Sequence, residues 1–200
     1  MEEKLPAVHV AVFASGAGSN AQKIIAHFKQ HPFIIISLVV CNKPGAGVLA
    51  VAEKENVPSL IIEKERFFRG DAYVGFFTEK KIDFIVLAGF LWKVPSALIQ
   101  YFSGRIINIH PALLPKYGGK GMFGNHIHEE VIKNKEKESG ITIHFADEIY
   151  DHGQIIFQAK CIIEENETAE SLAKKIHALE HKNFPKTIEL IINLQNIVKT

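Results

Sequence analysis

The feature of the sequence that most constrains the fold is a set of short, unbroken apolar runs rich in Val and Ile. The clearest are VHVAVFA (8–14), FIIISLVVC (33–41), DFIVLAG (83–89) and RIINIH (105–110). Runs that are apolar at nearly every position are typical of strands covered by helices on both faces, because a half-exposed strand alternates apolar and polar residues. Segments with helical spacing lie between the runs. This alternation predicts an α/β fold with a mainly parallel sheet.

The C-terminal part predicts two antiparallel strands followed by two helices. GITIHFAD (140–147) alternates apolar and polar residues in part, and GQIIFQAKCII (153–163) follows after a short loop. Strands this close pair antiparallel, because a parallel connection needs about a dozen residues or more. The tail (168–199) has helical spacing and opens with a capping-box pattern at Thr168. Because proline breaks helix interiors, we expect Pro185 to divide this tail into two helices.

Composition and charge limit the classes of function. The chain has 200 residues, 47% hydrophobic and 22% charged, with a formal net charge of +1. These values fit one globular domain, and the near-neutral charge argues against a broad electrostatic surface for nucleic acids. The net charge still allows a site for a small anion, because a few charged residues at one place hardly change the total charge of the chain.

The N-terminus and the cysteines predict a cytoplasmic chain. MEEKLPAVHV is acidic before it is apolar, unlike a signal peptide, and the longest apolar run is too short to span a bilayer. Cys41 and Cys161 lie in apolar stretches far apart and have no CxxC partner. We therefore expect reduced thiols and no membrane partner.

A glycine-rich loop, SGAGSN (15–20), separates the first predicted strand from the first predicted helix. Backbone N–H groups at such a helix N-terminus bind phosphate, and ligands of open α/β sheets gather at the carboxyl ends of strands. The loop fits neither GxGxxG nor the Walker pattern, which disfavours a dinucleotide or ATP. The pattern alone leaves open a phosphate site or an ordinary turn with Ser19 or Asn20 as helix cap.

Two polar side chains, Asn108 and His110, end the run RIINIH. Because side chains alternate along a strand, both point to one face, with Ile107 and Ile109 on the other. An Asn NH₂ group can stabilise an oxygen that becomes negative, and a histidine can protonate that oxygen or a leaving nitrogen. The pattern alone leaves open a group-transfer site or a hydrogen-bonded core pair.

An Asn–His pair of this kind needs a carboxylate that orients the histidine and stabilises its protonated form. The segment DEIYDHGQ offers three, and spacing does not choose among them: Asp147, Glu148 and Asp151. Other histidines raise the question of a metal: His126, His128 and His144. They lack a Cys or a second carboxylate–His set at ligand spacing, so we expect no metal site.

Four segments in this order make the chain resemble the folate-dependent formyltransferases: SGAGSN, LAGFLWKV, INIHPALLP and DEIYDHGQII. The resemblance covers nearly the whole chain, and the SGAGSN loop with a Glu in HALEH favours the members that act on glycinamide ribonucleotide in purine synthesis. It implies one Rossmann-like domain over residues 1–200, with a mainly parallel seven-stranded sheet, helices on both faces and an antiparallel C-terminal part. A phosphate-binding half (about 8–107) and a folate and catalytic half (about 83–200) are implied too.

The resemblance also assigns roles to residues. The family's catalytic Asn, His and Asp match Asn108, His110 and Asp151, so the choice of carboxylate comes from the resemblance. The ribonucleotide site matches Gly16, Ala17, Gly18, Ser19, Asn20 and Glu180. The folate site matches Arg69, Leu91, Trp92, Lys93, Val94, Asn108, Ala146, Asp147 and Glu148. Two features depart from the family pattern: Trp92, and a glycine-rich insertion (118–124) that lies by the folate site or only lengthens a surface loop.

The implied reaction transfers the formyl group of 10-formyltetrahydrofolate, the co-substrate, directly to the amine of glycinamide ribonucleotide. Asn108 and protonated His110 would stabilise the tetrahedral oxyanion, and Asp151 would raise the pKa of His110. The alternatives are a formyltetrahydrofolate hydrolase, a methionyl-tRNA formyltransferase, both with an additional domain, and a non-catalytic folate- or nucleotide-binding module. We expect a monomer or homodimer without a nucleic acid partner.

Overall fold

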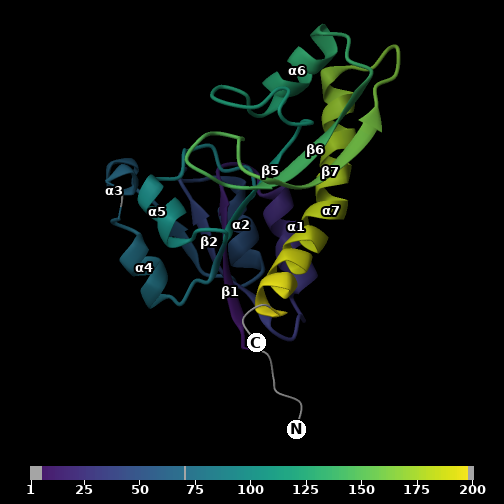
Figure 1. The fold of residues 1–200 in the computed structure, drawn as a ribbon. Helices are drawn as coiled ribbons and strands as arrows, with labels where there is room; N and C mark the ends of the chain where they lie inside the picture. The colour runs from purple at the N-terminus through teal and green to yellow at the C-terminus, as the bar shows by residue number, and fades with distance from the viewer. Residues whose placement is uncertain (1–5, 70, 198–200) are drawn as a thin grey trace.

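The computed structural model describes residues 6–69 and 71–197 and shows one seven-stranded sheet between two layers of helices (Figure 1). The strands are β1 (Val8–Ala14), β2 (Ile34–Cys41), β3 (Ser59–Ile61), β4 (Phe84–Leu87), β5 (Ile106–His110), β6 (Glu138–Phe145) and β7 (Ile155–Ile162). The helices are α1 (Ser19–Phe28), α2 (Gly47–Lys54), α3 (Lys64–Phe68), α4 (Val74–Glu79), α5 (Ser96–Tyr101), α6 (Asn125–Lys133) and α7 (Ala169–Ile197).

The strand order confirms the predicted fold class. The sheet runs β3-β2-β1-β4-β5-β6-β7, with parallel pairing from β3 to β5 and antiparallel pairing of β5 with β6 and of β6 with β7. The apolar runs form the central strands, and β4 is buried at every position. Burial on both faces explains why apolar and polar residues do not alternate along these strands.

Each face of the sheet has its own apolar core. Helices α1, α2, α6 and α7 cover one face, and α3, α4 and α5 cover the other, which the left side of Figure 1 shows. In β5, Ile107 and Ile109 pack into the core under α7. Their alternation places Asn108 and His110 on the opposite face, as predicted.

The sheet positions a site between β1 and β4. The chain leaves β1 toward α1 on one face, whereas it leaves the neighbouring β4 toward α5 on the other face. Loops that diverge in this way open a crevice at the carboxyl ends of the strands, which is where open α/β sheets bind ligands. We therefore expect a ligand site at the loops after β1, β4 and β5.

The expectation of two C-terminal helices was wrong, because α7 continues through Pro185. A proline inside a helix costs about 3 kcal/mol. Phe184 and Ile188 are fully buried on either side of it, and each buried apolar side chain contributes about 1.5–3 kcal/mol. Packing of α7 along the sheet thus outweighs the local penalty. The predicted start of this helix is confirmed, since the Thr168 hydroxyl accepts a hydrogen bond from the Ser171 N–H at 3.2 Å.

The helices α3 and α6 were not expected from the sequence. The helix α3 has only five residues, too few for helical periodicity to show. In α6, Ile127, His128 and Val131 are buried at helical spacing, but the glycine-rich segment before the helix obscured the pattern. None of the described helices is long and apolar enough to cross a membrane.

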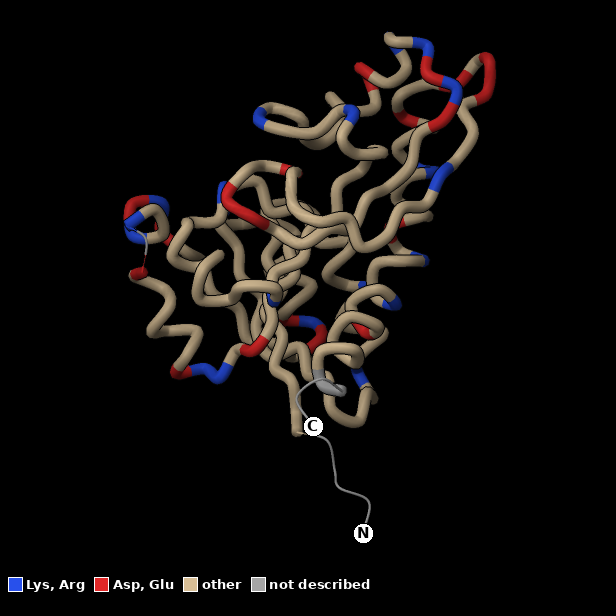
Figure 2. Tube along the Cα trace, viewed as in Figure 1, with Lys and Arg blue, Asp and Glu red and all other residues tan. Residues whose placement is uncertain are grey.

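Charged residues of both signs are scattered along the outer helices and the far end of β6 and β7 in the backbone trace of Figure 2. This distribution agrees with the net charge of +1.

We expect Phe184→Ala to lower the free energy of unfolding by about 3–5 kcal/mol, because it leaves a cavity where α7 meets the sheet. Urea denaturation followed by circular dichroism measures the change. Leu190→Ala on the same helix is the control, since this side chain is 55% exposed and its loss should change the free energy of unfolding by less than about 0.5 kcal/mol. Equal effects of the two substitutions would show that α7 does not depend on this packing.

Candidate active site

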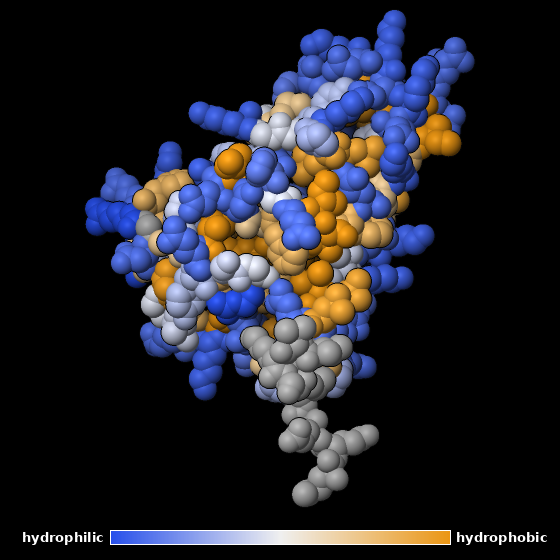
Figure 3. Space-filling view, in the orientation of Figure 1, coloured by the Kyte–Doolittle hydropathy of each residue, from blue (hydrophilic) through white to orange (hydrophobic). Residues whose placement is uncertain are grey.

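A cavity of about 770 Å³ opens at the carboxyl ends of β1, β4 and β5. Its wall includes the loop 16–20, the segment 87–94, the end of β5, the segment 119–125 and the loop after β6. Figure 3 shows apolar surface in a hollow of this face, bordered by hydrophilic side chains. A partly apolar cavity with a few convergent polar groups is the expected form of a small-molecule site.

The glycine-rich loop presents the N-terminus of α1 to the cavity. Gly18 has a φ of 83°, and α1 begins at Ser19 without a side-chain cap, which leaves the first N–H groups free for a ligand. A Cβ atom on Gly18 would lie 2.7 Å from the Cα of Val48, so only glycine fits. Asn20 Nδ2 donates to Glu180 Oε2 at 2.9 Å, which ties the loop to α7.

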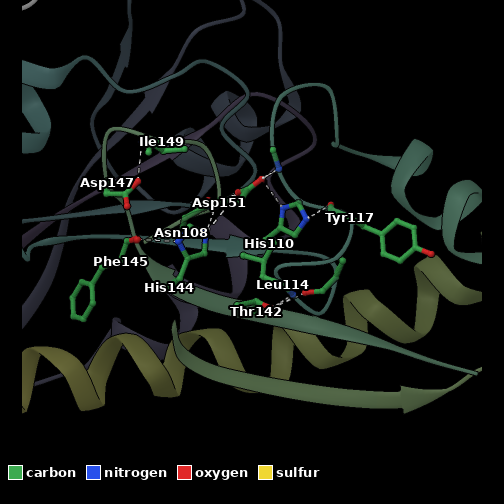
Figure 4. Close-up of polar contacts among 12 residues, drawn as sticks. Asn108, His110, Leu114, Tyr117, Thr142, His144, Phe145, Asp147, Ile149 and Asp151 are labelled. Atoms are coloured by element: carbon green, nitrogen blue, oxygen red, sulfur yellow. Dashed lines mark hydrogen bonds and ion pairs between the residues drawn. The ribbon is translucent and has the colours of Figure 1, made fainter. Parts of the chain in front are cut away.

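Asp151 is the centre of the polar cluster (Figure 4). Its Oδ2 lies 3.4 Å from Nδ1 of His110 and accepts from the N–H of Gly119 at 2.9 Å. Its Oδ1 lies 3.7 Å from Nε2 of His144 and accepts from Asn108 Nδ2 at 3.4 Å. The predicted residues Asn108, His110 and Asp151 are thus brought together, and of the three carboxylates only Asp151 contacts the pair.

The backbone around Asp151 has a conformation that few residue types tolerate. Asp151 has a φ of 54°, a left-handed conformation that Asp tolerates better than most residues. Gly153, two residues later, approaches β6 so closely that a Cβ atom would lie 1.8 Å from the carbonyl oxygen of Phe145. Asp147 closes the start of the loop by accepting from the N–H of Ile149 at 2.8 Å.

His110 faces acceptors at both ring nitrogens. Its Nε2 donates to the carbonyl of Tyr117 at 2.7 Å, and its Nδ1 faces the Asp151 carboxylate. A neutral ring has only one N–H, so the carboxylate favours the doubly protonated form. Burial opposes this charge more strongly, and the pKa of His110 is lowered overall. Asp151 raises the pKa of His110, as expected, but desolvation outweighs this ion pair, so the net pKa is lowered.

The lowered pKa of His110 also links the site to stability. Protonation of this histidine is harder in the folded than in the unfolded chain, where its pKa is about 6.5. The neutral ring therefore favours folding above that value, and the contribution is lost as the pH falls through the folded-state pKa.

Asp151 stays ionised in this environment. Burial acts to raise its pKa, but His144, His110 and the N–H of Gly119 favour the anion and together lower the pKa below its usual value. The ionised Asp151 and the mostly neutral His110 can therefore take up a proton as a pair. The proton binds to the histidine ring when charge develops on a substrate, and the carboxylate stabilises the resulting imidazolium.

Most of the predicted folate residues line the cavity, including Leu91, Trp92, Lys93, Val94, Ala146 and Asp147. Trp92 is held by aromatic packing, with ring centroids 5.8 Å from Phe67 and 5.6 Å from Phe68. Two predicted residues lie outside the wall. Glu148 accepts from Gln100 of α5 at 3.2 Å, and Arg69 is exposed at the end of α3.

Sequence reasoning did not assign a role to His144. It pairs with Asn108 across β5 and β6, and Asn108 Nδ2 lies 3.1 Å from its Nε2. The sequence placed His144 on a strand, but only the register of an antiparallel neighbour brings it beside Asn108. The glycine-rich insertion is likewise part of the cavity wall, and its Gly119 holds Asp151.

No group of three or more His, Cys, Asp or Glu suited to a metal ion occurs within residues 6–69 and 71–197. Two of the histidines considered as metal ligands lie in different places. His126 is on the exposed side of α6, and His144 is in the polar cluster around Asp151.

Comparison with known proteins identifies similar chains. The family described as formyl transferase matches residues 8–188. A phosphoribosylglycinamide formyltransferase of Bacillus subtilis is 37% identical over 191 residues, covering 93% of this chain and 95% of the relative. A trifunctional purine biosynthetic protein of Drosophila melanogaster is also 37% identical over 191 residues; the match covers 92% of this chain, which spans 14% of that protein's length. The crystal structure of phosphoribosylglycinamide formyltransferase from Bacillus halodurans has a TM-score of 0.83 and 39% identity, covering 92% of this chain and 95% of the other.

We expect Asp151→Asn to lower the pKa of His110 further, because burial remains while the carboxylate that favours the imidazolium is lost. NMR titration of the histidine ring signals measures the pKa. Asp147→Asn is the control, because Asp147 pairs with the exposed His152 at 3.0 Å and does not touch His110. An unchanged or higher pKa of His110 in Asp151→Asn would contradict the assigned ion pair.

Proposed function

Because the chain belongs to the formyl transferase family, we propose that it transfers the formyl group of 10-formyltetrahydrofolate to the amine of glycinamide ribonucleotide. The observation that carries this proposal is a single cavity whose wall includes an α1 N-terminus suited to phosphate, an apolar segment after β4 and the cluster of Asn108, His110 and Asp151. The names of the relatives from Bacillus subtilis and Bacillus halodurans support the same reaction.

In the proposed reaction, the neutral amine attacks the formyl carbon, and a C–N bond forms as the carbonyl π electrons move to oxygen. The Asn108 NH₂ group donates to this oxyanion in place of its long 3.4 Å contact to Asp151. Collapse of the tetrahedral intermediate breaks the bond to the folate nitrogen. No covalent bond to the protein is required.

His110 and Asp151 manage the proton in this proposal. The attacking amine becomes an ammonium group in the intermediate, and its proton must reach the folate nitrogen that leaves. His110 has a lowered pKa and is mostly neutral, so it can accept this proton while Asp151 stabilises the imidazolium. Direct contact with substrate requires that His110 exchange its hydrogen bond to the Tyr117 carbonyl for one to the reacting atoms.

The ribonucleotide is proposed to lie on the α7 side of the cavity. The loop from Gly16 through Ala17, Gly18 and Ser19 would bind the phosphate through backbone N–H groups. Glu180 is 4% exposed, and its Oε2 already accepts from Asn20 and His177. Its other oxygen would contact the sugar or the glycinamide end.

The folate is proposed to lie on the α5 side, between the segment 91–94 and the loop 146–151. Leu91 is 52% exposed in the wall, which suits an apolar ring. Arg69 and Glu148 would contact the folate only where it extends beyond the cavity, because neither lines it. Trp92 is half-buried against Phe67 and Phe68. We therefore expect the folate to contact its backbone as well as its ring.

We expect Asn108→Ala and His110→Ala each to lower kcat by about a hundredfold or more, since the loss of one oxyanion donor costs about 2.7–4 kcal/mol. Release of deformylated folate, followed with and without glycinamide ribonucleotide, measures turnover. Asn134→Ala is the control, because this side chain is exposed, donates to the Glu130 carbonyl at 2.8 Å and lies outside the cavity wall. Near-normal turnover in either site variant would remove that residue from the mechanism. Release that ignores the ribonucleotide would indicate a hydrolase.

We expect Gly18→Ala to weaken the binding of glycinamide ribonucleotide about tenfold, or about 1.4 kcal/mol, because the added Cβ must push the phosphate loop away from Val48. Gly75→Ala on α4 is the control, since a Cβ there meets nothing within 4 Å and the residue lies outside the cavity wall. Calorimetry measures both dissociation constants. Equal binding by the two variants would place the phosphate elsewhere.

A further inference from the structure

The backbone turn 117–119, which follows β5, touches both His110 and Asp151. The carbonyl of Tyr117 accepts a hydrogen bond from Nε2 of His110 at 2.7 Å. Two residues later, the N–H of Gly119 donates to Oδ2 of Asp151 at 2.9 Å. The position of this one turn therefore determines how the histidine ring and the carboxylate are held.

The turn has a backbone conformation that needs support from other parts of the chain. Tyr117 has a φ of 57° and Gly119 a φ of 94°. Glycine adopts positive φ values readily, but a bulky aromatic residue rarely does. Such a conformation persists only where the surrounding contacts hold it. We therefore looked for the contacts that fix Tyr117.

The side chain of Tyr117 provides these contacts. Its ring packs against the apolar core on the side of α6 and α7, and its hydroxyl donates to Oε1 of Glu136 at 3.0 Å. In Figure 4, the ring extends away from the polar cluster, whereas the carbonyl faces His110. Glu136 lies in the connection between α6 and β6 and also accepts from Nζ of Lys116 at 2.9 Å. The contact between Tyr117 and Glu136 thus anchors the turn to a different part of the fold.

The charges at this anchor favour a strong hydrogen bond. The pKa of Glu136 is lowered, first by its bond to Lys116 and then by its bond to Tyr117. The pKa of the Tyr117 phenol is raised, first by burial and then by Glu136. The phenol therefore keeps its proton and donates to an ionised carboxylate, which is stronger than a bond between neutral groups. Neither residue lines the cavity, so both can affect a bound substrate only through the turn.

We propose that Tyr117 and Glu136 are positioning residues: Glu136 anchors the Tyr117 phenol, and the anchored turn aligns His110 with Asp151. The inference rests on the proposed function, from which it takes the role of this pair in proton transfer. His110 must leave the Tyr117 carbonyl to reach the reacting atoms, and the anchor fixes the position from which the ring moves. A misplacement of about 1 Å that originates far from the chemistry can lower a rate about a hundredfold.

Steady-state kinetics with 10-formyltetrahydrofolate and glycinamide ribonucleotide tests the effect on the reaction. Tyr117→Phe and Glu136→Ala each break the anchor, and we expect kcat to fall about tenfold while KM for both substrates changes less than about twofold. The double variant should be no slower than either single variant, because both changes remove the same contact. Glu136→Gln should stay close to the wild type, since its side chain still offers an oxygen to the phenol.

Lys116→Ala is the matched control for the kinetics. Its side chain is 67% exposed, and its loss removes the other partner of Glu136 but leaves the phenol in place. We expect a kcat close to that of the wild type. A fall in kcat equal to that of Glu136→Ala would assign the effect to the ion pair with Lys116 and overturn the inference.

NMR of the His110 ring nitrogens tests the alignment without any substrate. A ring held by the Tyr117 carbonyl carries its proton on Nε2, whereas a ring released from it can place the proton on Nδ1 and donate to Asp151. We expect the signals of Tyr117→Phe and Glu136→Ala to shift toward the second form and those of Lys116→Ala to match the wild type.

The two measurements separate this inference from the proposed function. Unchanged ring signals in Tyr117→Phe and Glu136→Ala, or a kcat that stays at or above the wild-type value, would overturn the inference while formyl transfer still supports the proposed function. A wild type that transfers no formyl group would remove the proposed function, and the ring signals would still decide whether the anchor aligns His110.

Discussion

The Asp151 carboxylate is the interaction on which the site depends. It joins His110 and Asn108 of β5, His144 of β6 and the N–H of Gly119 in the glycine-rich segment. A buried anion needs several such partners, because burial alone would favour the neutral acid. The same contacts hold four parts of the chain together around the cavity. Loss of the carboxylate would therefore alter the charge of His110 and the position of the segment that closes the wall.

The sheet topology determines where this cluster can act. Because the chain leaves β1 and β4 toward opposite faces, their loops separate and leave room for two ligands next to the end of β5. The long helix α7 closes one side and brings Glu180 to the loop after β1. The antiparallel strand β6 closes the other side and brings His144 to Asn108. The pair Asn108 and His110 thus lies in the cavity wall between these two sides.

Much of the fold could be predicted, because the strands are buried on both faces and so show their burial directly as apolar runs. Pro185 misled the prediction, since a local rule was outweighed by the packing of Phe184 and Ile188. In the site, alternation alone placed Asn108 and His110 on one face. The choice of Asp151 needed the resemblance to formyltransferases; in the structure, Asp151 is the one of the three carboxylates that contacts His110 and Asn108. The pKa of His110 was not predictable, because it is a balance between burial and a carboxylate 41 residues away in sequence, whose distance from the ring is known only in three dimensions.

The sequence by itself determined the α/β class, the glycine loop before the first helix and the polar pair at the end of β5, because each depends on residues that are neighbours along the chain. Only the tertiary structure decided that His144 pairs with Asn108 and that the glycine-rich segment holds Asp151. These contacts join residues from different elements. Their physical cause is the register and packing of those elements, which no local pattern contains.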